Sequence, residues 1–212
     1  MSIATLYYNS DMNTTSFEEE NKPQIPKTKM EEKKETFFDL IKFALLALVI
    51  IVPIRTFIAQ PFIVSGASMV PTFEDRDYLI VDELSYRLSE PHRGDVVIMR
   101  FPEDKKRFFI KRIVGLPNET ISVAKSQTTI TNAEHPQGMI LDESYVKNKS
   151  DQQASVTLGS DEYFVMGDNR SGSFDSRSWG PLKRNLIIGR PLVRLLPVKH
   201  IKGLPGKHEF TN

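Results

Sequence analysis

The hydrophobic and polar positions divide the chain into three parts. Residues 1–36 are mainly polar, and from residue 9 onward they hold too few apolar side chains to offset the entropy cost of ordering. Residues 37–58 are mostly apolar. Beyond them, short apolar runs alternate with turn residues. This pattern predicts a flexible tail over residues 1–36, one apolar helix over residues 37–58 and a β domain after it.

The apolar segment is long enough to span a membrane as a helix. At roughly 1.5 Å per residue, the helix from Phe38 to Ile58 would be about 32 Å long. Its charged residues lie near its ends, where long side chains can reach water. The uninterrupted apolar run, Phe43 to Ile54, is short enough to fit a signal-peptide core or a buried helix as well. The long polar stretch before it favours a membrane anchor over a cleaved signal.

The distribution of basic residues around this segment predicts its orientation. Six lysines lie on its amino side or near its start: Lys22, Lys27, Lys29, Lys33, Lys34 and Lys42. Near its other end Arg55 is the only basic residue. Because positive residues stay inside, we expect a single-pass protein of the cell membrane with residues 1–36 in the cytoplasm. A β domain over residues 59–200 and a tail over residues 201–212 would then be extracytoplasmic.

The region beyond the anchor shows the short runs of a mainly β fold. Six runs predict strands: residues 78–81, 96–99, 108–114, 120–123, 162–166 and 192–196. Proline and glycine separate them, and no repeat of 20–50 residues suggests a solenoid or a propeller. The polar segment 125–155 is expected to form a hairpin excursion with long loops.

Composition and charge exclude several classes of function. A length of 212 residues allows one compact domain with an appendage. Lysine and arginine number 28 against 27 acidic residues, so the net charge of +1 gives no strongly basic surface, and we expect no nucleic-acid partner. The chain has no cysteine, which excludes thiolate catalysis and disulfides. The four histidines are scattered, so neither a metal nor a cofactor is expected.

Two segments of the β region are dense in turn formers and hydroxyls. Residues 65–72 read Ser-Gly-Ala-Ser-Met-Val-Pro-Thr, a turn that can present the Ser68 hydroxyl together with its own backbone N–H. Residues 167–177 read Gly-Asp-Asn-Arg-Ser-Gly-Ser-Phe-Asp-Ser-Arg and are typical of a structured, functional loop. Taken singly, each is more often only a turn.

The strand predicted over residues 108–114 carries a lysine between apolar neighbours. Strand alternation places Lys111 on the same face as Phe109 and Ile113. A lysine in apolar surroundings loses solvation, so its neutral amine becomes accessible. A lone lysine on a strand more often reaches solvent.

Together, these three segments resemble the bacterial type I signal peptidases, membrane-anchored serine proteases that remove signal peptides from exported proteins. Residues 68–72 resemble the family's nucleophile box, residues 111–117 its lysine box, and residues 167–177 its Gly-Asp-Asn-Arg box. Residues 93–97 and 187–190 add shorter matches. Three boxes in order are hard to explain by coincidence.

The resemblance implies a signal-peptidase-like β domain and a Ser-Lys dyad. Ser68 would be the nucleophile and Lys111 the general base, with an acyl-enzyme intermediate. Ser173 would orient the lysine amine. Asp175 and Arg177 would form the pair that braces the loop, so Asp175 should not pair with Lys111.

The sequence departs from the family pattern at two places. Some members carry a serine that contacts the oxyanion where this chain has Gly66, so backbone donors, including the Ser68 N–H, must serve here. Asn118-Glu119 replaces a common Gly-Asp, which keeps a residue that tolerates left-handed backbone and keeps the acid.

The family also implies the partners. The substrate would be a secretory preprotein with small residues at the first and third positions before the cut, bound by one monomer. Met69, Pro71 and Phe109 are the candidates for contact with it. The lipid bilayer would touch an apolar patch near the nucleophile. The candidates for that patch are Phe57, Phe62, Met69 and Phe73.

Two alternatives remain at this stage. Self-cleaving repressors of the DNA-damage response also use a Ser-Lys dyad, but a membrane segment and the lack of a helix-turn-helix region argue against them. A membrane-anchored binding module that lost its activity is opposed by the presence of both dyad residues.

Overall fold

The computed structural model describes residues 29–53, 59–208 and 210. Contacts divide the chain into two units, up to Leu46 and from Ala47 onward. The second unit contains every described strand and every candidate site residue.

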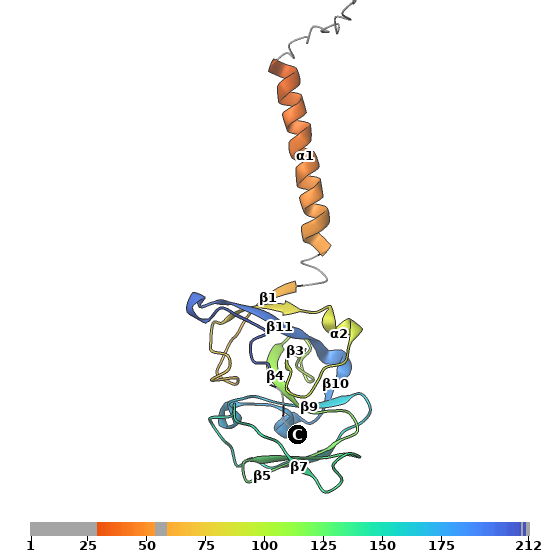
Figure 1. Cartoon of the computed structure of the whole chain (residues 1–212), viewed down its shortest axis with the longest axis vertical. Coiled ribbons are helices and arrows are strands. Elements are labelled where there is room, and N and C mark those ends of the chain that lie inside the picture. Colours follow the sequence, from red (N-terminus) through yellow and green to blue (C-terminus); the bar gives the residue numbers. More distant parts are fainter. Residues whose placement is uncertain (1–28, 54–58, 209, 211–212) are drawn as a thin grey trace, which may run out of the picture. The chain divides into compact units, whose positions relative to one another are not determined.

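Helix α1 covers Lys29–Pro53 (Figure 1). It therefore begins inside the segment expected to be a tail, because the Glu- and Lys-rich sequence there consists of good helix formers. Among the described residues, no helix is both long and apolar enough to cross a membrane. Residues 1–28 of the predicted tail and 54–58 of the predicted anchor lie outside the described residues.

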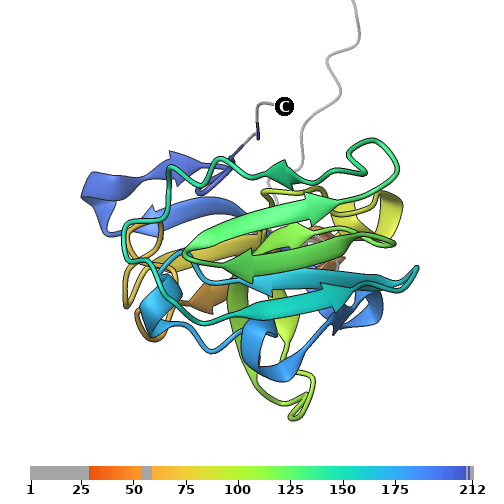
Figure 2. The same ribbon diagram turned by 90° about the horizontal axis from the view of Figure 1, so that it is seen from below.

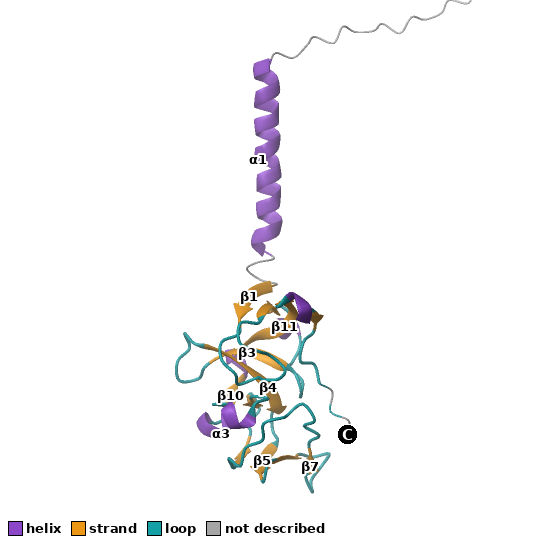
Figure 3. Ribbon diagram, turned by 90° about the vertical axis from the view of Figure 1, so that its left-hand side faces the viewer, coloured by secondary structure: helices purple, strands orange, loops and turns teal. Residues whose placement is uncertain are grey.

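The rest of the described chain is mainly β, as predicted (Figure 3). The larger sheet has the order β1-β2-β11-β3-β4-β9-β10, with β12 beside β11. Its strands are β1 (Ala59–Ile63), β2 (Tyr78–Asp82), β3 (Val96–Arg100), β4 (Phe108–Gly115), β9 (Glu162–Met166), β10 (Leu182–Lys183), β11 (Ile187–Leu196) and β12 (Lys202–Gly203). All six predicted strands are confirmed, either here or in the second sheet.

The polar segment after β4 builds a second, smaller sheet, which Figure 2 shows face on. Its order is β7-β6-β5-β8. Its strands are β5 (Thr120–Ala124), β6 (Gln127–Thr131), β7 (Met139–Ile140) and β8 (Ala154–Thr157). The short helices are α2 (Ser85–Leu88), α3 (Ser176–Trp179), and the 3-10 turns η2 (Arg170–Gly172), η3 (Arg184–Leu186) and η4 (Val198–His200). The expected hairpin excursion is thus the β5–β6 hairpin with β7 and β8 at its sides.

Strand pairing brings the three candidate segments together. β4 lies between β3 and β9, with Val97 opposite Lys111 and Met166 opposite Arg112. The Gly167 loop starts directly after β9, and the Ser68 turn connects β1 to β2. The pairing of β9 with β4 therefore places the Gly167 loop beside the middle of β4. The Ser68 turn comes from strands farther along the sheet and meets this loop through the hydrogen bond from the Asn169 N–H to the Ser68 carbonyl.

Three apolar clusters form the core of the second unit. One packs the Ser68 turn and β2 through Val64, Met69, Phe73, Leu79, Val81, Val96 and Ile98. Another joins the two sheets through Val114, Ile121, Val123, Ile130, Leu141, Leu158, Phe164 and Met166. The third packs on the larger sheet through Val97, Met99, Ile113, Val165 and their neighbours. Each such buried side chain contributes about 1.5–3 kcal/mol, so the turn that carries Ser68 is fixed by its own core.

The described residues of the expected C-terminal tail, 201–208 and 210, make contacts with the domain. β12 pairs with β11, and the Gly206 carbonyl accepts a hydrogen bond of 2.6 Å from Arg112. Pro205 is buried, and Phe210 packs against the cluster that joins the two sheets. These contacts are made with residues distant in the sequence, so the local pattern of residues 201–212 gives no signal of them.

Candidate active site

The Ser68 turn is closed at its base and takes a left-handed backbone conformation at Gly66. Val64 donates to the Asp77 carbonyl over 2.9 Å and thereby closes the loop. Gly66 has a φ of +94°, a conformation that side-chain-bearing residues rarely adopt. Its N–H donates to Asp75 Oδ1 over 2.8 Å. The turn therefore holds Ser68 half-buried at its end.

The Gly167 loop holds the Ser68 turn from the other side. Asn169 donates from its backbone N to the Ser68 carbonyl over 3.0 Å, and from Nδ2 to the Ala67 carbonyl over 2.9 Å. Thr72 Oγ1 donates to Asp168 Oδ2 over 2.5 Å. The loop thus clamps the backbone on both sides of the nucleophile candidate.

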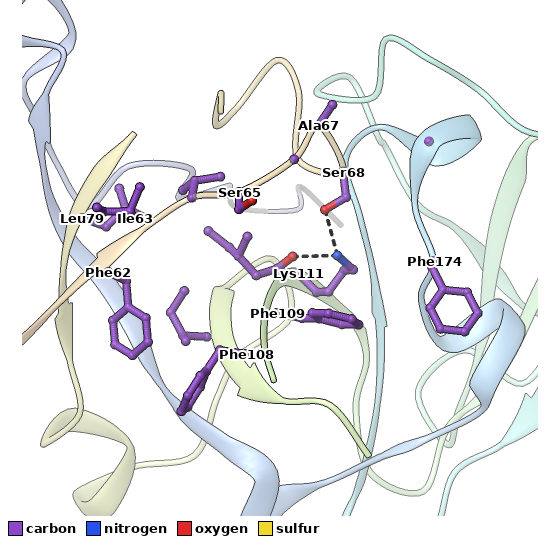
Figure 4. Close-up of a pocket in the computed structure, with 15 residues that line it drawn as sticks. Phe62, Ile63, Ser65, Ala67, Ser68, Leu79, Phe108, Phe109, Lys111 and Phe174 are labelled. Atoms are coloured by element: carbon purple, nitrogen blue, oxygen red, sulfur yellow. Dashed lines mark hydrogen bonds between the residues drawn. The ribbon is translucent and has the colours of Figure 1, made fainter. Parts of the chain in front are cut away.

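Lys111 reaches Ser68 from the middle of β4. Its Nζ donates to Ser68 Oγ over 2.8 Å and to the Ile110 carbonyl over 3.0 Å (Figure 4). The Lys111 residue is only 4% exposed, and its Nζ lies 5.2 Å from the Phe109 ring centroid. The two residues that the sequence singled out are therefore in hydrogen-bond contact.

The surroundings of Lys111 favour its neutral form. Burial lowers the pKa of the Lys111 amine to about 8, while the carboxylates of Asp175 and Asp168 raise it to a smaller extent. Each of these carboxylates forms an ion pair with another residue, Asp175 with Arg177 and Asp168 with Arg112. A neutral amine at hydrogen-bond distance from a hydroxyl can accept its proton.

Asp175 and Arg177 brace the loop as expected. Their side chains pair over 2.8 Å and are almost fully buried. Asp175 also accepts from the Gly167 N–H over 3.1 Å, and Arg177 Nη2 donates to the Arg170 carbonyl over 2.7 Å. The pair therefore ties the two ends of the loop together.

Ser173 lies within the same loop, but its hydroxyl forms no hydrogen bond with any described residue. Its Oγ is buried and has no hydrogen-bond partner among the described residues. A Cβ at Gly167 would collide with this Oγ and with the Ser68 carbonyl oxygen, so glycine is needed where these groups meet. The expected bond from Ser173 to Lys111 is absent from the hydrogen bonds of the described residues.

A cleft of about 330 Å³ extends from the dyad (Figure 4). Phe62 and Phe108 lie toward one end, and Ser68 and Lys111 lie toward the other. The lining residues are Phe62, Ile63, Val64, Ser65, Gly66, Ala67, Ser68, Leu79, Ile98, Phe108, Phe109, Ile110, Lys111, Gly172 and Phe174. The cleft is thus mainly apolar and follows the end of β1.

The cleft includes only some of the residues expected to contact substrate or lipid. Phe109 lines it, whereas Met69 and Pro71 do not. Met69 and Phe73 are 1% and 0% exposed, so they are core residues and form no lipid-facing patch. Phe57 lies outside the described residues. Large apolar side chains next to a tight turn pack beneath it, which sequence proximity to the nucleophile does not reveal.

Sequence reasoning missed the partner of Arg112, the neighbour of Lys111. Arg112 donates from Nε and Nη2 to the two Asp168 oxygens over 2.8 Å and 2.6 Å. Its Nη1 donates to the carbonyls of Gly94 and Gly206. The box patterns contain both Arg112 and Asp168, but their spacing gives no signal that they pair.

Comparison with known proteins places this chain in a family. A family model described as "Signal peptidase, peptidase S26" matches residues 37–196. The chain is 35% identical to the probable signal peptidase I-2 of Synechocystis sp., over 82% of this chain and 80% of that protein. It is 34% identical to signal peptidase I P of Bacillus subtilis subsp. natto, over 82% and 97%.

A crystal structure of a signal peptidase I from Enterococcus faecalis V583 is 26% identical, with a TM-score of 0.41 over 48% of this chain and 97% of that chain. On the match over most of its length and its identity to these relatives, the chain belongs to the signal peptidase family, peptidase S26, and is a serine endopeptidase.

Proposed function

We propose that this chain is a membrane-bound signal peptidase that cleaves N-terminal signal peptides from exported preproteins through a Ser-Lys dyad. The observation that carries the proposal is the 2.8 Å hydrogen bond between Lys111 Nζ and Ser68 Oγ in a buried site at the end of a cleft. The names of its relatives supply the substrate class.

In the first half-reaction Ser68 would be acylated. The neutral Lys111 amine accepts the hydroxyl proton as Ser68 Oγ attacks the scissile carbonyl carbon. The Ser68 N–H donates none of the hydrogen bonds found among the described residues, so it is free to donate to the oxyanion. A single donor of this kind is worth about 3 kcal/mol of transition-state stabilisation. The Lys111 ammonium then protonates the leaving amine, and the mature protein departs.

In the second half-reaction water would release the signal peptide. The Lys111 amine, neutral again, accepts a proton from water as its oxygen attacks the Ser68 ester. The ester bond breaks, and the proton returns from Lys111 to Ser68 Oγ. The signal peptide leaves with a new carboxyl group, and both residues recover their starting state.

The cleft suits an extended peptide. β1 is the edge strand of the larger sheet, and its last residue Ile63 lines the cleft together with Val64. An extended segment could pair with this edge, which would direct alternate side chains into the cleft. We propose that the small residues before the cut bind here, with Phe109 contacting them. For Met69 the burial supports packing beneath the turn instead.

The supporting residues would act on the dyad through the backbone. Gly66 permits the turn that exposes Ser68, and Asp175 with Arg177 fixes the Gly167 loop. Ser173 would orient the lysine amine after a rotation of its hydroxyl. One chain supplies all of these groups, so a monomer suffices.

We also propose the membrane anchor over residues 37–58, with residues 1–36 in the cytoplasm and the domain of residues 59–200 outside. The apolar side chains of α1 that are described are largely exposed, Phe43 at 70% and Val49 at 65%. Lysines cluster on the amino side of the segment. Near β11 and β12, Val198 and Ile201 are 68% and 58% exposed and would touch lipid.

Cleavage of a preprotein by the full chain in detergent tests the proposed reaction. The wild type should cut after the signal peptide, as read by sequencing the new amino terminus. Ser68→Ala should be inactive, while Ser155→Ala, which changes an exposed serine of β8, should match the wild type. An active Ser68→Ala variant would contradict the mechanism.

Protease treatment of spheroplasts tests the proposed orientation. External protease should digest the β domain and spare residues 1–36. Digestion of only the amino-terminal tail would show the reverse orientation.

A further inference from the structure

The loop after β7 sends a buried carboxylate into the base of the Gly167 loop. Arg170 donates from Nη2 to Glu143 Oε1 over 2.5 Å and from Nη1 to Glu143 Oε2 over 3.0 Å. The two side chains are 7% and 9% exposed. Thr128 Oγ1 of β6 donates to the same carboxylate over 2.9 Å. A paired and buried fork of this kind is among the stronger polar contacts in proteins.

Tyr145 extends the same contact toward Arg112. Its ring centroid lies 4.2 Å from Arg112 Cζ and 5.9 Å from Arg170 Cζ. Its hydroxyl donates to Glu143 Oε1 over 3.2 Å. The smaller sheet therefore contacts both arginines that lie behind the dyad.

Arg170 passes this contact on to the nucleophile turn. Its Nε donates to the Gly167 carbonyl over 3.0 Å, and its own carbonyl accepts from Arg177. Asn169, between Gly167 and Arg170 in the chain, is the residue that clamps the carbonyls of Ser68 and Ala67. The side chains of Arg170 and Arg177 thus fix the two ends of the segment that carries the clamp.

We propose that Glu143 is a positioning residue for the reaction: by holding Arg170 it fixes Asn169, and through Asn169 it keeps Ser68 against Lys111. The proposal rests on the Ser-Lys dyad proposed above. It gives the smaller sheet a role in catalysis, because the only charge that faces the Arg170 guanidinium from that sheet, among the described residues, is Glu143.

Loss of the Glu143 charge should alter the position of Ser68 and the pKa of Lys111, and not only the stability of the fold. A looser clamp moves Ser68 away from the amine and admits water to Lys111. Because the low pKa of Lys111 comes mainly from burial, added water should raise it. The peptide would pair with β1, which is held by β2, and the Gly167 loop adds only Gly172 and Phe174 to the cleft, so KM should change much less than kcat.

The test compares three variants of the full chain in detergent with a preprotein substrate. Glu143→Gln keeps the size of the side chain and removes its charge, and Tyr145→Phe removes only the hydroxyl. Asp142→Asn, at an exposed neighbouring acid, is the matched control. A buried charge-assisted contact is worth about 1.5–3 kcal/mol, so kcat of Glu143→Gln should fall by about 10-fold to 100-fold.

The expected pattern has three parts. In Glu143→Gln, kcat falls, KM stays within about twofold, and the acid limb of the kcat/KM profile moves to higher pH. Tyr145→Phe shows the same changes to a smaller extent and serves in place of Glu143→Gln if that variant does not fold. Asp142→Asn matches the wild type.

Two results would overturn the proposal. One is a folded Glu143→Gln, or failing it Tyr145→Phe, with wild-type kcat and acid limb. The other is a rise in KM or a loss of thermal stability without any shift of the acid limb, which would make Glu143 only structural. In both cases an inactive Ser68→Ala would leave the dyad itself standing, so the two proposals fail separately.

Discussion

The two faces of β4 carry adjacent basic residues in different surroundings: one residue is paired with a carboxylate and the other is not. Lys111 and Arg112 are consecutive and both buried, at 4% and 1% exposed. Arg112 meets both oxygens of Asp168 and two backbone carbonyls. Lys111 meets one hydroxyl and one carbonyl, and no carboxylate contacts it among the described residues. The face with Arg112 therefore stabilises the fold, and the face with Lys111 leaves an amine that can act as a base.

The difference follows from what each side chain can do when desolvated. A guanidinium keeps its proton, so burial without a carboxylate would be very costly, and pairing is required. An ammonium can release its proton, so burial without a partner lowers its pKa and yields a base. The same strand can carry both because alternation sends neighbouring residues to opposite faces.

The largest effect should come from removing the base while keeping its charge. Lys111→Arg keeps a long cationic side chain that cannot accept the serine proton, so kcat/KM should fall by at least about 1,000-fold. Cleavage kinetics on a preprotein measure it, with Lys147→Arg at an exposed lysine as control. A working Lys111→Arg enzyme would mean that Lys111 acts only through its charge.

Removing the ion pair of Arg112 on the other face of β4 should lower the stability of the protein. Arg112→Met leaves Asp168 buried without its partner, which should lower the free energy of unfolding by about 3–5 kcal/mol. Urea denaturation of the full chain in detergent measures the loss. Arg76→Met, whose side chain is 91% exposed, should change it by less than about 1 kcal/mol. Equal losses in the free energy of unfolding for the two substitutions would show that the buried ion pair of Arg112 does not stabilise the protein.

Lys111→Met should do the opposite and stabilise the protein at neutral pH. Below pH 8 the amine is charged in both the folded and the unfolded states, and its burial costs up to about 3 kcal/mol at 1.36 kcal/mol per pKa unit. Above pH 8 the unfolded chain binds more protons, so the wild type gains stability as pH rises toward its unfolded pKa near 10.4. The advantage of the variant should therefore shrink between pH 8 and 10.4. A variant less stable than the wild type at pH 7 would contradict the cost of burial.

The smallest effect should come from Ser173→Ala. The hydroxyl has no partner among the described residues, so its loss should leave the free energy of unfolding nearly unchanged. If it orients the amine during turnover, kcat should fall on the order of 10-fold, the worth of one hydrogen bond. Stopped assays at saturating substrate measure the change. An unchanged kcat would remove Ser173 from the mechanism.

Local features of the fold could be predicted from the sequence. The six strands follow from short apolar runs between turn residues, which are local signals. Asn118 has a φ of +66°, as the tolerance of asparagine for left-handed backbone suggested. Ser68 and Lys111 were found through ordered motifs, and the structure places them in contact.

Contacts between distant residues could not be predicted. Arg112 and Asp168 are 56 positions apart, and Glu143 and Arg170 are 27 apart, so no pattern in either segment reveals the pair. The two-residue strand β7 is too short to show a period. The C-terminal residues look like a tail because their packing partners come from elsewhere in the chain.

Direct titration of the Lys111 amine tests the central claim, that burial without a paired carboxylate makes this lysine a base. The full chain in detergent, labelled with ¹³C at lysine Cε, would be followed by NMR from pH 6 to 11, and the Lys111 signal would be assigned by its loss in Lys111→Met. We expect a midpoint of about 8 for Lys111, well below the ordinary lysine value near 10.4. A Lys111 midpoint near 10.4 would contradict it.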